Sequence, residues 1–393
     1  MDLLAIQSFL RQQQIDAWLI YDFRGSNPVI GQLWPGKQRW TTRRMAVVIP
    51  ATGPARLAVH RIDAPQFADV RDCQQTVYLR WQEWQAWMKS AVAGARRVAM
   101  EYSPMGELPA VSATDGGTID FVRSTGVEVV SSADVMQFSV ARWSDPIRAD
   151  HVRAARLVNA IKDEAFDLIR SRLCDGQPVD EFRVQKHIVS RFAEEGLDPD
   201  HPPIVGVNAH SADPHFELSP ANSSEIRRGD WILIDLWARW PGEQHVFSDI
   251  TWVAFAGDRV PPEHQRAFDA VRAARDAALK LAQDSVRNRT PVRGWQLDDA
   301  ARSILEGSGY AENVFHRTGH SLSPGPKIHG LGVNIDNFET HDTRLLLPGL
   351  GFTIEPAVYL PGKFGCRLEI NAFVDEHEGV VVTSDVQREV VLV

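Results

Sequence analysis

Four acidic residues stand in or beside strand-like apolar segments, and they form two pairs with the same spacing. In the first pair, Asp235 follows the apolar run WILI, and Asp249 precedes the run ITWVAF fourteen residues later. Burying a carboxylate at the end of an apolar strand costs free energy unless a partner compensates its charge. A hairpin that returns the chain beside Asp235 would bring the two carboxylates together, where they repel each other unless a cation or a proton lies between them.

The second pair repeats this arrangement near the C-terminus. Glu355 and Glu369 lie inside the strand-like segment GFTIEPAVYLPGKFGCRLEINAFV, fourteen residues apart across a turn at residues 361–363. Either pair alone is compatible with an ordinary hairpin whose acids are solvated. Two hairpins that deliver four carboxylates favour a site for Mn²⁺, Co²⁺ or Zn²⁺, completed by a single imidazole. His320, in FHRTGHSLSPGPKIHG, is the candidate imidazole, although a lone histidine is more often structural or exposed.

The length and patterning of the chain predict two domains. At 393 residues and 44% hydrophobic composition, the chain can bury a large core. Residues 1–145 alternate short apolar runs with helix-like stretches, which is typical of a compact α/β domain. The sequence SDP then opens a long amphipathic segment over 147–173, because serine or aspartate before proline commonly begins a helix. Residues 146–393 read as α+β, with antiparallel hairpins and a helical run over 262–284.

Composition excludes several kinds of partner. The 51 acidic side chains outnumber the 42 basic ones and give a net charge of -9, the wrong sign for binding nucleic acid. Three cysteines without CxxC spacing, Cys73, Cys174 and Cys366, fit reduced thiols in a reducing compartment. The N-terminus does not resemble a signal peptide, and no run approaches the roughly 18 apolar residues of a membrane span. We therefore expect a cytoplasmic protein without a membrane partner.

Several segments together resemble a known family. NAHSADPHF, FSDITWVAF, FHRTGH and GFTIEPAVYLPG are similar to segments of the pita-bread metallopeptidases, which include prolidase, aminopeptidase P, methionine aminopeptidase and creatinase. The resemblance covers about residues 150–393. The first domain is similar to the smaller N-terminal domain of the prolidase, aminopeptidase P and creatinase branch. The resemblance implies a C-terminal pita-bread domain after a smaller α/β domain, and usually a homodimer.

The resemblance also implies two divalent metal ions per subunit, Mn²⁺ in the first place and Co²⁺ or Zn²⁺ as alternatives. By position, Asp235 chelates one ion, while Asp249 and Glu369 bridge both. His320 and Glu355 complete the second ion's ligands. A hydroxide that bridges the ions is then the nucleophile, because two cations lower the pKa of water toward about 7. Glu355 can act as the proton acceptor.

Four further residues match the family's functional positions. His215 and His329 match histidines that bind substrate and stabilise the tetrahedral intermediate. His316 matches a further histidine of the prolidase branch. Arg367 can orient Glu369 or bind a substrate carboxylate. For each of these, a solvated loop side chain is the alternative interpretation.

The chain departs from the family pattern in the spacing of its aspartates and of its histidines, and also where Val246 replaces a tyrosine and Trp252 an arginine. Asp235 and Asp249 are separated by three residues more than is usual, which implies a longer hairpin tip around residues 240–243. We expect this tip to border the mouth of the active site. His320 and His329 are nine positions apart rather than seven, and HG replaces the usual HE or HD, which leaves the placement of His329 open.

The predicted function is that of an Xaa-Pro dipeptidase, a prolidase-like hydrolase. A dipeptidase needs a cation for the substrate carboxylate, and Arg367, Arg43 and Arg44 are candidates unless they are simply solvated. An aminopeptidase P that acts on longer peptides is the first alternative, and an amidohydrolase like creatinase or ectoine hydrolase is the second. A non-catalytic pita-bread module that binds proteins belongs to a different class, and such modules typically lose the metal ligands that this chain retains.

Overall fold

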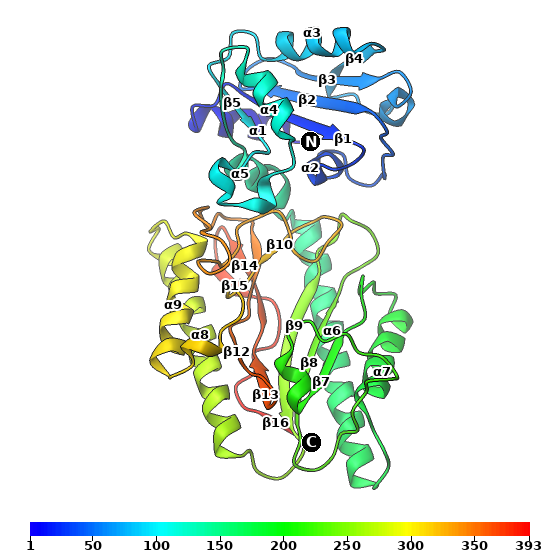
Figure 1. The fold of residues 1–393 in the computed structure, drawn as a ribbon, viewed down its shortest axis with the longest axis vertical. Helices are drawn as coiled ribbons and strands as arrows, with labels where there is room; N and C mark the ends of the chain where they lie inside the picture. The colour runs from blue at the N-terminus through cyan, green and yellow to red at the C-terminus, as the bar shows by residue number, and fades with distance from the viewer. The chain divides into compact units, whose positions relative to one another are not determined.

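The computed structural model describes residues 1–393, and the chain divides into two compact units (Figure 1). The first unit comprises Met1–Arg142 together with Pro324–Pro326. The second unit comprises Trp143–Ser323 and Lys327–Val393. None of the helices combines the length and the apolar character needed to cross a membrane.

The first unit is built on a mixed six-stranded sheet with the strand order β4-β3-β2-β1-β5-β6. β1, β2 and β3 are antiparallel neighbours, whereas β4, β5 and β6 pair in parallel with the strands beside them. The strands are β1 (Ala17–Phe23), β2 (Arg44–Pro50), β3 (Ala55–His60), β4 (Cys73–Tyr78), β5 (Arg97–Met100) and β6 (Glu128–Ser131). The helices are α1 (Leu3–Gln12), α2 (Pro28–Leu33), α3 (Trp81–Ala91), α4 (Gly116–Arg123) and α5 (Ala133–Met136).

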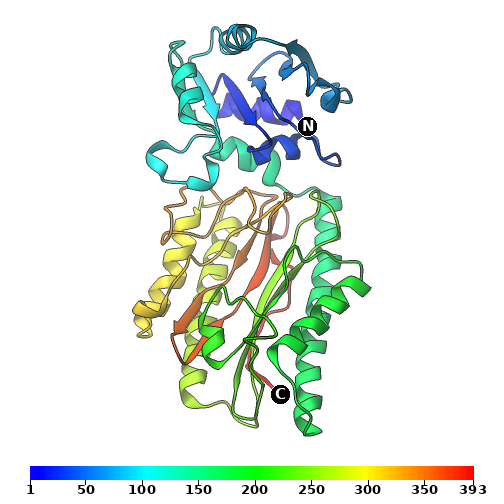
Figure 2. The ribbon, with the colours of Figure 1, turned by 45° about the vertical axis from the view of Figure 1, so that its right-hand side comes forward.

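The second unit places two four-stranded sheets and a hairpin between pairs of helices. The sheet orders are β16-β9-β8-β7 and β10-β11-β14-β15, and β12 pairs with β13. Figures 1 and 2 show α6 and α7 on one side of the strands and α8 and α9 on the other. The helices are α6 (Asp145–Cys174), α7 (Glu181–Glu194), α8 (Pro262–Arg287) and α9 (Gly294–Gly307). The strands are β7 (Ile204–Val207), β8 (Trp231–Ala238), β9 (Ser248–Phe255), β10 (Ser321–Leu322), β11 (Gly351–Ile354), β12 (Ala357–Leu360), β13 (Phe364–Arg367), β14 (Ile370–Asp375), β15 (Gly379–Val382) and β16 (Val391–Leu392). This architecture confirms the α+β prediction.

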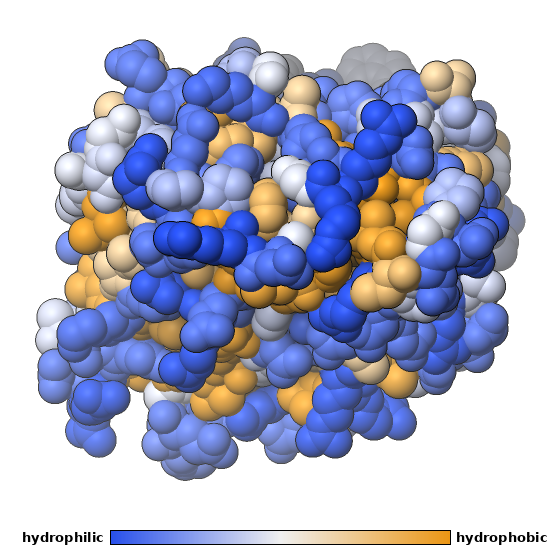
Figure 3. Space-filling model, turned by 90° about the horizontal axis from the view of Figure 1, so that it is seen from below, coloured by the Kyte–Doolittle hydropathy of each residue, from blue (hydrophilic) through white to orange (hydrophobic).

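Helix α6 shows how the sequence pattern becomes a buried face. It begins at Asp145 with Pro146 in its first turn, where proline has no N–H to leave unpaired. Its buried apolar side chains recur every three or four residues, which places them on one stripe against β8 and β9. The outer surface carries the polar residues, and the face seen in Figure 3 is mostly hydrophilic, with hydrophobic side chains visible between the polar ones.

The longer tip between β8 and β9 does not lie where we expected it. Trp240 donates a hydrogen bond from Nε1 to the carbonyl oxygen of Asp150 at 3.0 Å. His245 Nδ1 lies 3.1 Å from Asp150 Oδ2. These contacts hold the tip against the first turns of α6, and no tip residue lines the cavity that contains the predicted ligands. The prediction that this tip borders the active-site mouth is therefore wrong, because an aromatic and an imidazole side chain anchor it to the helix.

One carboxylate of the first unit, that of Glu101, is fully buried. It accepts hydrogen bonds from Trp18 Nε1 at 2.7 Å, Asn27 Nδ2 at 2.8 Å and Ser132 Oγ at 3.0 Å. Burial raises the pKa of Glu101 to about 7, although these donors oppose the shift. The folded chain therefore holds this proton more tightly than the unfolded chain does.

We expect the stability contributed by Glu101 to be fully present below pH 4.5 and to fall as the pH rises through 7. Glu101→Gln removes this titration. Between pH 4.5 and a pH above 7, the free energy of unfolding of the variant relative to wild type should therefore rise by about 3 kcal/mol. Urea denaturation at several pH values, followed by tryptophan fluorescence, measures this change.

Glu128→Gln is the matched control, because the Glu128 side chain on β6 is 63% exposed. Its stability relative to wild type should stay constant over the same pH range. A Glu101→Gln variant whose relative stability is equally insensitive to pH would contradict the assignment.

Candidate active site

The hairpin of β8 and β9 brings the first two predicted ligands together. The strands are antiparallel, with Asp235 opposite Thr251 and Asp249 opposite Trp237. Asp235 and Asp249 are thus diagonal neighbours on one face of the ladder, since residues two apart on a strand point to the same side. Both carboxylates are buried, with relative exposures of 6% and 4%. The predicted hairpin is confirmed.

The two glutamates occupy a break in the neighbouring ladder. The pairing of β11 with β14 ends at Ile354 opposite Ile370, and the pairing of β12 with β13 begins at Ala357 opposite Arg367. Glu355 and Glu369 lie between these two ladders, rather than inside strands as the apolar pattern suggested. The break explains the difference, because the chain leaves one strand pair and enters the next at these residues.

Hydrogen bonds across the middle of the unit join this break to β9. The backbone N–H of Glu369 donates to the carbonyl oxygen of Thr251 at 3.1 Å. The side-chain amide of Asn371 accepts from the backbone N–H of Asp249 at 3.0 Å and donates to its carbonyl oxygen. Asn371 thus satisfies both backbone groups of Asp249, which fixes this aspartate beside Glu369.

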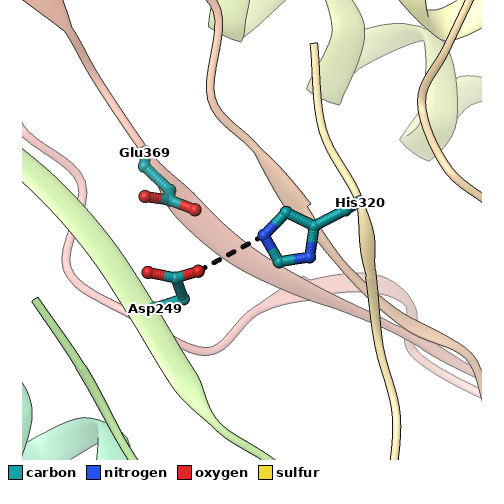
Figure 4. Close-up of side chains that lie close together, drawn as sticks. All are labelled: Asp249, His320 and Glu369. Atoms are coloured by element: carbon teal, nitrogen blue, oxygen red, sulfur yellow. Dashed lines mark ion pairs between the residues drawn. The ribbon is translucent and has the colours of Figure 1, made fainter. Parts of the chain in front are cut away.

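His320 completes the group from the segment just before β10. Figure 4 shows its imidazole directed at Asp249, with Glu369 beside them. His320 Nε2 lies 3.3 Å from Asp249 Oδ2 and 3.5 Å from Glu355 Oε1. His320 Nδ1 lies 3.1 Å from the carbonyl oxygen of Ser321, which can only accept, so Nδ1 carries the proton of the neutral ring. The lone pair of Nε2 therefore faces carboxylate oxygens, an arrangement that a cation between them would stabilise.

The buried trio of Asp249, His320 and Glu369 fits a metal ion. Their possible ligand atoms lie within 4.8 Å of one another. Burial and then the neighbouring carboxylates raise the pKa values of Asp249 and Glu369 well above their usual range, and burial lowers that of His320. Glu369 Oε1 has no hydrogen-bond partner although it is buried. A set of carboxylate oxygens with one unprotonated imidazole suits a divalent ion.

Arg367 holds Asp235 rather than Glu369. Its Nη2 donates to Asp235 Oδ2, and its Nε donates to the hydroxyl of Thr251 at 2.9 Å. The same hydroxyl lies 3.0 Å from Asp235 Oδ1 and 2.9 Å from Glu369 Oε2. Because a hydroxyl has one proton, it can satisfy only one of these carboxylates at a time. Asp235 keeps the Arg367 guanidinium as its partner in either case, so Glu369 is the acid without an ion pair.

His316 belongs to a hydrogen-bonded chain that starts at Arg367. Arg367 Nη1 donates to the Tyr359 hydroxyl at 3.3 Å, and this hydroxyl lies 2.8 Å from His316 Nε2. His316 Nδ1 lies 2.6 Å from the carbonyl oxygen of Arg317, so it carries the proton and Nε2 accepts from tyrosine. Burial lowers the pKa of His316 to about 3. Both ring nitrogens are thus bound to the protein, and a catalytic part for His316 stays a prediction.

His329 reaches the site despite its unusual spacing. Its ring centroid lies 4.2 Å from that of His320. Arg317 Nη2 lies 3.3 Å from His329 Nδ1, and a guanidinium can only donate. Nδ1 is therefore the acceptor, and the neutral ring carries its proton on Nε2. This tautomer makes His329 a hydrogen-bond donor on its other side.

One cavity of about 400 Å³ contains these groups, a size typical of small-molecule sites. Its lining includes all five predicted metal ligands together with His215, His316, His329 and Arg367. The His215 ring makes no hydrogen bond to the protein, which leaves both of its nitrogens available. The remaining wall combines apolar residues with one further ion pair. It is formed by Ile204, Pro214, Trp237, Phe315 and Ile328, together with Arg317 and Glu339.

Arg43 and Arg44 line a different cavity, which lies within the first unit. Its walls also include the aromatic residues Tyr21, Tyr78 and Trp81. A part for these two arginines in substrate binding stays a prediction.

Three residues of the site escaped the sequence analysis. Thr251 follows Asp249 by two positions on β9, so the strand period alone could have placed it on the same face. Tyr359 lies in β12, two positions after Ala357, but nothing in the sequence indicates that its hydroxyl contacts Arg367. Arg317 stands three positions before His320 in an irregular segment, where no periodicity predicts the direction of a side chain.

Comparisons with known proteins identify the family of the chain. Residues 150–376 match the family described as metallopeptidase family M24. The probable dipeptidase PepE of Mycobacterium tuberculosis is 27% identical over 357 residues, which cover 89% of this chain and 86% of that protein. The crystal structure of dipeptidase PepE from Mycobacterium ulcerans has a TM-score of 0.72 at 22% identity, covering 99% of this chain and 96% of that one.

A prolidase structure is similar as well. The prolidase from Pyrococcus horikoshii OT3 has a TM-score of 0.66 at 22% identity, with 99% of each chain covered. The family match covers more than half of the chain, and the solved structures share its fold. The chain therefore belongs to metallopeptidase family M24 and is a divalent-metal peptidase with the pita-bread fold.

Proposed function

We propose that this peptidase is a dinuclear dipeptidase that hydrolyses Xaa-Pro dipeptides. One observation carries the metal part of the proposal: the unprotonated Nε2 of His320 faces the carboxylates of Asp249 and Glu355 inside a buried cavity. Similar proteins are named dipeptidase and prolidase, and these names support dipeptides as the substrate class of this chain.

The distribution of acids around the cavity supports two ions rather than one. Asp249, His320 and Glu369 form the central trio, while Asp235 and Glu355 line the same cavity. Asp235 and Glu369 share the single proton of Thr251, and Glu355 Oε1 faces His320. In the proposed site, Asp249 and Glu369 would be shared by both ions, Asp235 would complete the ligands of one ion, and His320 and Glu355 would complete those of the other. Mn²⁺ is the first choice, and Co²⁺ or Zn²⁺ fit the same ligands.

Divalent ions at this site supply the activation of water and polarise the scissile carbonyl. Glu355 lines the cavity, where it can accept the proton of the attacking water. His329, with its proton on Nε2, can donate to the oxygen on which negative charge develops. The ring of His215 lines the cavity and makes no hydrogen bond to other residues, so it can contact the substrate. The retained ligands argue against a non-catalytic protein-binding module.

We expect the wild-type chain to bind two divalent ions after reconstitution with Mn²⁺. Glu369→Gln should bind one or fewer, because it removes the charge of a bridging ligand. Its kcat/KM should fall by more than about 100-fold, since even partners of metal ligands contribute about 10- to 100-fold. Elemental analysis of the dialysed protein, combined with a peptidase assay, measures both effects.

Glu378→Gln is the matched control, because this glutamate is 67% exposed at the turn before β15. It should retain the metal content and the activity of wild type. Fewer than one ion per wild-type chain would reverse the proposal in favour of a binding module.

The substrate prediction is tested with a matched pair: an Xaa-Pro dipeptide and the same sequence extended by several residues. We expect the Mn²⁺-loaded protein to cleave the dipeptide and to leave the longer peptide largely intact. A preference for the longer peptide would identify an aminopeptidase P instead. Hydrolysis of neither, by protein that holds its metal, would direct attention to amide or amidine substrates of the creatinase and ectoine-hydrolase kind.

We also propose that the chain forms a homodimer and that its domains comprise residues 1–145 and 146–393. The first unit exposes large apolar side chains that a subunit interface could cover, among them Trp40, Leu79 and Trp81. Light scattering at working concentration should give the mass of two chains. A monomer mass would sink this proposal without affecting the metal site.

A further inference from the structure

We propose that Arg317 binds the C-terminal carboxylate of the dipeptide and thereby determines that this enzyme acts on dipeptides. The inference rests on the proposed function and assigns one of its requirements to a residue. A dipeptidase must recognise a free carboxylate next to the scissile bond, and a guanidinium matches that group with parallel charge-assisted hydrogen bonds.

Elimination within the cavity points to Arg317. Arg367 and Arg317 are the only arginine or lysine side chains in its lining. Each of the three guanidinium nitrogens of Arg367 donates a hydrogen bond, to Asp235, Thr251 or Tyr359. Binding substrate through Arg367 would therefore release a buried acid, which costs free energy. Arg317 makes no hydrogen bond or ion pair to any of the predicted metal ligands.

Arg317 is held in place but still has donors to offer. Its Nη1 lies 3.3 Å from Glu339 Oε2 and 4.0 Å from Oδ2 of the buried Asp336, and its Nη2 lies 3.3 Å from His329 Nδ1. Its backbone N–H also donates to Glu339 Oε1 at 3.1 Å. A guanidinium has five N–H groups, so Nε–H and a second proton on each terminal nitrogen remain. The Arg317 side chain is 17% exposed, and a partly desolvated charge attracts a carboxylate more strongly than one in water.

The position of Arg317 fits the length of a dipeptide. In an extended chain, consecutive Cα atoms are about 3.8 Å apart, so the carboxylate lies one residue beyond the scissile carbonyl. The guanidinium of Arg317 contacts the His329 ring, and the centroid of that ring lies 4.2 Å from the centroid of the His320 ring. A cation that contacts the imidazole next to a proposed metal ligand suits a carboxylate one residue beyond the scissile bond.

Apolar residues near Arg317 suit the C-terminal side chain of the dipeptide, which would lie between the proposed metal ligands and the guanidinium. Phe315 and Ile328 line the cavity as apolar neighbours of Arg317 and His329 in the sequence. Phe315 stacks on Tyr359 with ring centroids 5.4 Å apart, which fixes its orientation. A compact apolar residue such as proline can pack on this wall while its carboxylate meets the guanidinium.

Glu339 gives the assignment a second, independent consequence. Its carboxylate competes with the substrate for the same guanidinium, and its side chain is 42% exposed, so water can compensate it when the substrate displaces it. Removing the charge of Glu339 should therefore free Arg317 for the substrate. Changes at Arg317 and Glu339 are expected to shift the recognition of the carboxylate in opposite directions.

The test compares an Xaa-Pro dipeptide with its C-terminal amide, which lacks the negative charge but keeps the scissile bond. Wild type should prefer the acid. Arg317→Gln should lower kcat/KM for the acid by about 10- to 100-fold, mainly through KM, and should change that for the amide far less. Arg317→Lys should retain part of the preference as a point charge. Glu339→Gln should increase the preference for the acid.

Arg43→Gln and Arg44→Gln test the competing candidates, because both arginines line the cavity of the first unit. Arg287→Gln is the matched control, because this side chain at the end of α8 is 73% exposed. Metal content and thermal unfolding are measured for every variant. Equal losses on acid and amide in Arg317→Gln would show that Arg317 acts only by orienting His329, and would overturn the assignment. So would a preference for the acid that survives in Arg317→Gln and disappears in Arg43→Gln or Arg44→Gln. If metal-loaded wild type cleaves neither compound, the proposed function itself fails.

Discussion

The electrostatic repulsion among buried carboxylates is the constraint on which the rest of the second unit depends. Asp235, Asp249, Glu355 and Glu369 converge on one cavity, and the imidazole of His320 presents a lone pair to them rather than a proton. One arginine and one hydroxyl proton cannot balance four acids. The two sheets, the break between the ladders and the two pairs of helices hold these acids at a distance where they repel each other unless a cation or a proton lies between them.

The backbone holds the four carboxylates in fixed positions although they repel each other. The β8–β9 hairpin is regular, and it fixes the two aspartates through strand register. The glutamates lie instead where two ladders meet, so their positions depend on links to β9: the Glu369 N–H to Thr251 and the Asn371 amide to Asp249. The backbone N–H of Glu369 thus bonds to β9 rather than to a neighbouring strand of its own ladder. Regular strand pairing is interrupted at the two glutamates, which are the proposed metal ligands.

The sequence predicted those parts of the site that follow from periodicity or from family pattern, and it failed where the backbone is irregular. The hairpin carrying Asp235 and the long helix opening at Asp145 could be read from apolar spacing and proline. Thr251 was within reach, since it shares the face of Asp249. Arg317 was not, because its direction depends on contacts with Glu339 and His329 that are distant in the chain. The longer tip was misjudged since loop length alone does not say which neighbour a loop will contact.

That tip also bears on how such an enzyme can change its substrates. Trp240 and His245 fasten it to Asp150 on α6, away from the cavity lining. Insertions between the two aspartates can therefore accumulate without narrowing access to the metals. The stretch from Phe315 to Glu339, by contrast, supplies the cation, its competing acid and part of the apolar wall. Among enzymes of this fold with different substrates, we therefore expect substitutions in that stretch, and we expect the four acids on either side of it to stay the same.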